Sequence, residues 1–150
     1  MRILAALISL GRFAFGVTFI AKPNVMDRAW IGKQARLPGA QVLSRAVGAR
    51  DLALGLGGLQ ALTRDDGSAR PWLAAAAICD AVDLGATWAA DKGIPRQARS
   101  GVLAIAGGSA LLSALAAAGI GRSRRPEPLA PGADDLTMTS AARSAPVGTA

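Results

Sequence analysis

Four apolar segments, each close to the length that crosses a lipid bilayer, make up most of this chain: residues 3–21, 41–62, 72–90 and 100–121. A helix needs about 20 residues to span about 30 Å of hydrocarbon. The breaks between the segments are polar and contain Pro or Gly, which end helices. The last segment has no charged residue on any face, whereas a surface helix of a soluble bundle would show a polar one. The sequence therefore predicts an all-α, integral membrane four-helix bundle in residues 1–121.

Composition limits the chemistry open to this protein. The 150 residues suffice for one domain, 51% of them are hydrophobic, and the net charge is +7. The basic residues separate the apolar segments and have few aromatic neighbours for base stacking, so we expect membrane lipids as partners and no nucleic acid. A homo-oligomer or a membrane partner is a further candidate. The chain has no His and one Cys, which argues against zinc, haem and Cys/His catalysis, and we expect no cofactor and no metal.

Two parts of the chain lie outside the apolar segments. Residues 25–41 mix apolar and basic side chains, which fits either a short interfacial helix with Trp30 at the headgroup level or an irregular basic loop. Residues 122–150 begin with three arginines and are then rich in Pro and small polar residues, so we expect a disordered tail. An even number of spans puts both termini on one side. We expect a multi-pass cell-membrane protein, and the three arginines next to the last span favour cytoplasmic termini.

Ionisable residues lie near the middle of three apolar segments: Arg12 in the first, Arg50 and Asp51 in the second, and Asp80 and Asp83 in the third. Arg45 lies in the second segment too, about two turns from its centre. Each unpaired charge at the centre of a membrane helix costs about 2.5–3.5 kcal/mol. Three arginines and three aspartates can neutralise one another completely. We therefore expect an intramembrane polar cluster, because such residues usually face a protein interior and pair there.

Helical periodicity predicts where these residues meet. The polar or small residues form one stripe per helix: Ser9, Arg12 and Gly16; Ser44, Gly48, Asp51, Gly55 and Gly58; Ala76, Asp80, Asp83 and Thr87. Small residues let helices approach closely, so we expect Gly48, Gly55 and Gly58 to be helix-packing positions, and also Gly57 and the pair Gly107-Gly108. Arg50 lies about 100° around the helix from Asp51 and should meet a different neighbour. Arg45 either joins the cluster or extends to the headgroups.

One short motif resembles a known family. The residues Gly48-Ala49-Arg50-Asp51-Leu52-Ala53-Leu54-Gly55 match a Gly-x-Arg-Asp-x-x-x-Gly signature, and Gly11-Arg12, Gly16 and Pro23 precede it in a similar layout. This pattern resembles that of DUF4267, a family of small four-helix membrane proteins of unknown function, over residues 10–120. The resemblance implies a membrane four-helix fold. It implies no reaction and no catalytic residues.

Three functions remain open from the sequence. We expect a structural protein or an accessory to a partner; the alternatives are a proton-linked small transporter subunit and a membrane enzyme that acts on a lipophilic substrate with Asp80 or Asp83 as the acid. Whether it is an enzyme, and which residues would be catalytic, stays open. A tightly paired interior without a cavity would favour the first function. We also expect that Asp80 and Asp83 line a polar cavity, with at least one of them near Arg12 or Arg50.

Overall fold

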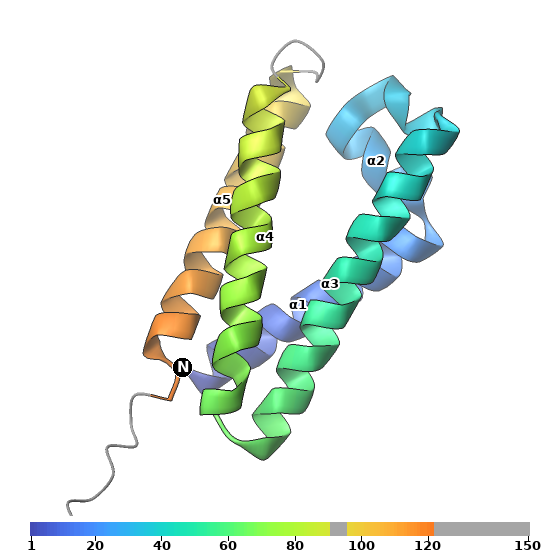
Figure 1. The fold of residues 1–150 in the computed structure, drawn as a ribbon. Helices are drawn as coiled ribbons and strands as arrows, with labels where there is room; N and C mark the ends of the chain where they lie inside the picture. Colours follow the sequence, from blue (N-terminus) through green and yellow to red (C-terminus); the bar gives the residue numbers. More distant parts are fainter. Residues whose placement is uncertain (91–95, 122–150) are drawn as a thin grey trace, which may run out of the picture.

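A computed structural model describes residues 1–90 and 96–121, and every regular element in them is helical (Figure 1). The four long helices are α1 (Arg2–Ala21), α3 (Pro38–Arg64), α4 (Arg70–Ala89) and α5 (Arg96–Gly119). The short elements are α2 (Pro23–Ile31) and two 3₁₀ turns, η1 (Gly32–Arg36) and η2 (Gly67–Ala69). The predicted all-α class is confirmed. The predicted tail, residues 122–150, lies outside the described residues.

Of the two interpretations of residues 25–41, a short helix or an irregular loop, the structure agrees with the helix, because α2 and η1 occupy most of this segment. Proline stands in the first turn of α2, α3 and α4, where its missing N–H costs no hydrogen bond. Gly32, with φ 65°, ends α2 in a backbone conformation that favours glycine. Trp30 turns inward and meets Phe19 edge-on, with 6.4 Å between ring centroids.

The long helices are arranged as two pairs. α1 packs mainly against α3 and α4 mainly against α5, while α2 covers one end of the space between the pairs (Figure 1). At the opposite end the pairs join through an apolar core that includes Ala5, Leu62, Leu73 and Ile120. Arg2 also donates a hydrogen bond to Asp66 there, at 2.6 Å. The N-terminus and the end of α5 lie together at this end.

Glycines set the distance between α1 and α3. A Cβ on Gly55 would lie 2.5 Å from the backbone nitrogen of Phe13, and a Cβ on Gly48 would lie 2.9 Å from the carbonyl oxygen of Gly16. Gly58 packs against Ser9, and Gly57 packs against the ring of Trp72. The close packing predicted for these glycines is confirmed.

The same prediction was wrong for the pair Gly107-Gly108 in α5. A Cβ on Gly107 would make only an ordinary contact with Leu84, and a Cβ on Gly108 would meet nothing within 4 Å. Gly108 lines a cavity instead of another helix, and the contact of Gly107 with Leu84 of α4 is not a close one.

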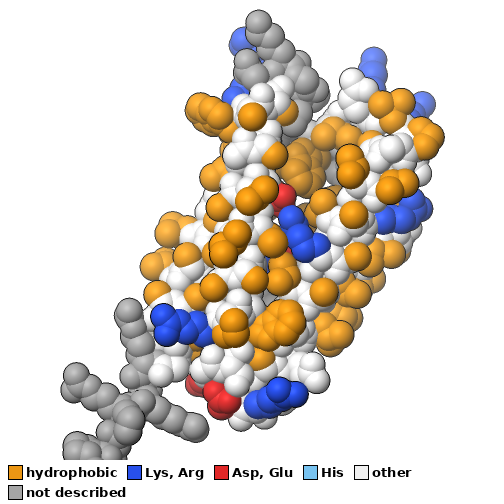
Figure 2. Space-filling view, viewed as in Figure 1, with side chains coloured by type: hydrophobic (Ala, Val, Ile, Leu, Met, Phe, Trp, Pro, Cys, Tyr) orange, Lys and Arg blue, Asp and Glu red, His pale blue; other side chains and the backbone are white. Residues whose placement is uncertain are grey.

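Polarity is distributed in the reverse of the usual order. The buried residues include many polar ones, and the buried apolar residues are mostly alanines. Large aliphatic side chains are exposed on the outer faces: Ile3, Val42, Leu43, Ile78, Val82 and Leu111 are all at least 60% exposed. Figure 2 shows hydrophobic side chains spread over one face of the molecule. Soluble monomers rarely expose apolar surface on this scale.

Two of the four predicted spans are long and apolar enough to cross a membrane, namely α1 and residues 99–119 of α5. α3 and α4 do not reach the same mean hydropathy, because the ionisable residues of the predicted cluster lie in them. The membrane four-helix bundle therefore remains a prediction.

Candidate functional site

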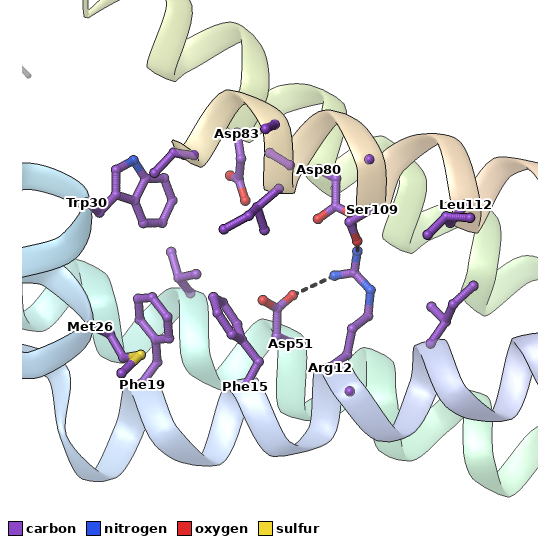
Figure 3. Close-up of a pocket in the computed structure, with 18 of the residues that line it drawn as sticks. Arg12, Phe15, Phe19, Met26, Trp30, Asp51, Asp80, Asp83, Ser109 and Leu112 are labelled. Carbon is purple, nitrogen blue, oxygen red and sulfur yellow. Dashed lines mark hydrogen bonds and ion pairs between the residues drawn. The ribbon is translucent and has the colours of Figure 1, made fainter. Parts of the chain in front are cut away.

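The three predicted stripes meet inside the molecule, at the level where α1, α3 and α4 face one another (Figure 3). At their centre Arg12 is only 7% exposed, Asp51 3% and Asp80 7%. The side chains of Asp83 and Arg50 are about four-fifths and three-quarters buried. The sequence therefore identified a real cluster, because helical periodicity fixes which residues share a face.

Arg12 is the bridge of the cluster. Its Nη1 donates a hydrogen bond to Asp51 Oδ1 at 2.8 Å, and its Nη2 donates to Asp80 Oδ2. Nη2 also lies 3.3 Å from the carbonyl oxygen of Ala76 and 3.3 Å from Ser109 Oγ of α5. A single guanidinium thus joins α1 to the three other long helices, and its flat fork suits two carboxylates at once.

Arg50 makes the second set of ion pairs. Its Nη1 and Nη2 donate to the two oxygens of Asp83, at 3.1 and 2.8 Å, and Nη2 lies 3.3 Å from Asp51 Oδ1. The prediction that Arg50 meets a different neighbour from Asp51 is confirmed. Asp51 is paired most closely with Arg12, not with the adjacent Arg50.

Arg45 does not join the cluster. It is exposed on α3, although Ser44 beside it is buried, because one residue further along a helix lies about 100° around it. The inclusion of Arg45 was wrong. The cluster therefore holds two arginines, Arg12 and Arg50, and three aspartates, Asp51, Asp80 and Asp83, and its ionised form is not neutral.

A cavity of about 820 Å³ borders this cluster, between the two helix pairs. Asp80 and Asp83 line it, as predicted, together with Arg12 and Asp51 (Figure 3). The expectation of a polar cavity was wrong, since most of the wall is apolar and comes from α1, α2 and α5: Leu7, Ile8, Phe15, Phe19, Met26, Trp30, Val102, Ile105 and Leu112. The cavity thus has apolar walls and one charged face.

Two carboxylate oxygens of the cluster are left without a hydrogen bond from any described residue, namely Asp51 Oδ2 and Asp80 Oδ1. Neither atom is enclosed by the protein. Nε of Arg12 and Nε of Arg50 lack a hydrogen-bond partner too, but the protein encloses both of these atoms. Of these four unpartnered atoms, the two that are not enclosed are therefore hydrogen-bond acceptors.

Sequence reasoning missed Asp27. Its side chain is 2% exposed and lies at hydrogen-bond distance from Ser44, which joins α2 to α3. The two residues also line a smaller cavity, of about 190 Å³, next to Trp30. Asp27 becomes buried only because α2 folds back over α3. The local sequence, one aspartate in a basic segment, therefore does not indicate its burial. The contact holds α2 across the end of the larger cavity.

The carboxylates are not arranged as metal ligands: among the described residues no group of three or more His, Cys, Asp or Glu side chains could hold a metal ion. Instead, arginine guanidinium groups lie between the aspartates.

A scan against protein-family models and searches of curated proteins and of solved structures gave no significant match to this chain. The resemblance to DUF4267 stays a prediction.

Proposed function

We propose that this chain is an integral membrane protein that binds a lipophilic small molecule in the cavity between the α1–α3 and α4–α5 pairs. The observation that carries the proposal is the cavity itself, with apolar walls beside a buried charged cluster. A purely structural set of ion pairs would leave no such space. Ligand pockets usually measure about 300–1,000 Å³ and combine apolar walls with a few polar groups, which fits this one.

The reversed distribution of polarity supports the membrane location. Large aliphatic side chains on the outer faces suit lipid, and the ionisable residues of α3 and α4 are paired inside. Pairing removes much of the cost that an isolated charge would carry in hydrocarbon. All four long helices are thus proposed to span the bilayer, including the two with lower mean hydropathy. Cytoplasmic termini stay a prediction.

We expect the full-length protein to remain in the membrane fraction after washing with sodium carbonate at high pH and with high salt. Both treatments remove proteins held by charge, whereas helices inserted in hydrocarbon need detergent for release. Immunoblotting of pellet and supernatant is the measurement, and release by dodecyl maltoside is the control. Recovery of the protein in the carbonate supernatant would refute the membrane location.

Ligand binding is tested by filling the cavity. Gly108 lines the cavity and a Cβ there meets nothing within 4 Å, so Gly108→Leu places a side chain in the ligand's space. We expect this variant to lose at least about tenfold of its affinity for the neutral lipophilic dye N-phenyl-1-naphthylamine, a change of about 1.4 kcal/mol. Fluorescence titration of the purified protein, corrected with protein-free micelles, is the measurement.

Gly85→Leu is the matched control. Gly85 also lies on a long helix, and a Cβ there would likewise meet nothing within 4 Å, but this residue does not line the cavity. The affinity of the variant for the dye should equal that of the wild type. Equal binding by Gly108→Leu and Gly85→Leu, or no binding by the wild type, would contradict the proposed site.

A further inference from the structure

We infer that the ligand of this cavity is a lipophilic cation, an organic ammonium or phosphonium with a bulky apolar body; the inference rests on the proposed function. It follows from the charge balance of the cluster, from the atoms that face the cavity and from the aromatic side chains in the wall.

The charges of the cluster do not cancel. The ionised cluster has two positive and three negative side chains, and Arg45, which would have balanced them, is exposed elsewhere on α3. The excess carboxylate lies beside an apolar cavity, where an uncompensated charge is costly. A bound monovalent cation makes the sum zero.

The geometry of the hydrogen bonds points the same way. Asp51 Oδ2 and Asp80 Oδ1 are acceptors without donors among the described residues, and both side chains line the cavity. The terminal nitrogens of Arg12 and Arg50 already donate to carboxylates, and the unpartnered Nε atoms are enclosed. An anion entering the cavity would meet arginines that are already paired with carboxylates, and the net negative charge of the cluster would repel it. A cation finds two free oxygens.

The wall suits an organic cation. Phe15, Phe19 and Trp30 line the cavity, and Phe19 contacts both of the others, with 4.5 Å between the centroids of the two phenylalanines. The faces of aromatic rings attract cations, and more strongly where water is excluded. The aliphatic side chains around them would contact the apolar body of the ligand. An inorganic cation would leave this space unfilled.

The first test compares two probes of matched shape and opposite charge, tetraphenylphosphonium and tetraphenylborate. Equilibrium dialysis uses the purified full-length protein in dodecyl maltoside, and protein-free micelles correct for partition of each probe. We expect the cation to bind at least about tenfold more tightly than the anion. Equal or tighter binding of the anion would overturn the inference.

The second test changes the charge of the cluster. Asp80→Asn and Asp83→Asn each leave two arginines against two aspartates. We expect the ratio of affinities for tetraphenylphosphonium and the neutral dye N-phenyl-1-naphthylamine to fall at least about tenfold in each variant. The matched control is Asp66→Asn, which changes a half-buried aspartate outside the cluster, at the end of the bundle, and should keep the ratio. An unchanged ratio in Asp80→Asn and Asp83→Asn would overturn the inference.

Different results would overturn the cationic ligand and the proposed function. Binding of the neutral dye without any preference for the cation would overturn the cationic ligand and leave the proposed function intact. Absence of both would overturn both. The comparison of probes needs no substitution, so the inference stays testable if Asp80→Asn does not fold; Asp83 is the less buried of the two aspartates.

Discussion

Replacing Arg12 by methionine is expected to destabilise the protein by about 3–5 kcal/mol, the usual cost of breaking a buried ion pair on one side. Methionine fills part of the same space but donates no hydrogen bond. Asp51 and Asp80 would each lose their closest cationic partner while remaining buried. Arg50 would then face three carboxylates alone. The measurement is unfolding of the purified protein in dodecyl maltoside, followed by circular dichroism.

Arg45→Met is the matched control. It removes the same side chain from an exposed position in a long helix, where substitutions usually change stability by less than about 0.5 kcal/mol. The double variant Arg12→Met/Asp80→Asn should be less destabilised than the sum of its two single changes, because one substitution removes the charge that the other leaves unpaired. Equal stability of Arg12→Met and Arg45→Met would show that the cluster is not a buried network.

The sequence was sufficient to identify the cluster. Helical periodicity assigned Ser9, Arg12 and Gly16 to one face, and all three are buried. It placed Asp51 and Asp80 on facing stripes, and Arg12 joins them. This information is local, because the rotation per residue of a helix is constant.

What the sequence could not supply depends on how the helices pack. Whether Arg45 turns inward depends on where α3 meets its neighbours, and the structure leaves it outside. The apolar walls of the cavity come from residues of α1, α2 and α5, which periodicity alone identifies only as apolar. Asp27 becomes buried because α2 folds back over α3, and that return is a property of the whole chain.

Replacing Gly55 by alanine is expected to destabilise the protein by about 2–3 kcal/mol, although alanine favours helix by about 1 kcal/mol over glycine. The added Cβ would lie 2.5 Å from the backbone nitrogen of Phe13 and 2.6 Å from the carbonyl oxygen of Ser9. Backbone atoms cannot turn aside as a side chain can, so α1 and α3 must separate. The ion pair between Arg12 and Asp51 lies one turn away and would lengthen as they do.

Gly85→Ala separates packing from helix propensity. A Cβ there meets nothing within 4 Å, so the same substitution should stabilise the protein by up to about 1 kcal/mol. The two variants, unfolded side by side in the same detergent, should therefore shift the midpoint in opposite directions. If Gly55→Ala stabilised the protein as Gly85→Ala does, α1 and α3 would not approach each other through their glycines. In that case, close packing of these glycines would not be what brings Arg12 within hydrogen-bond distance of Asp51.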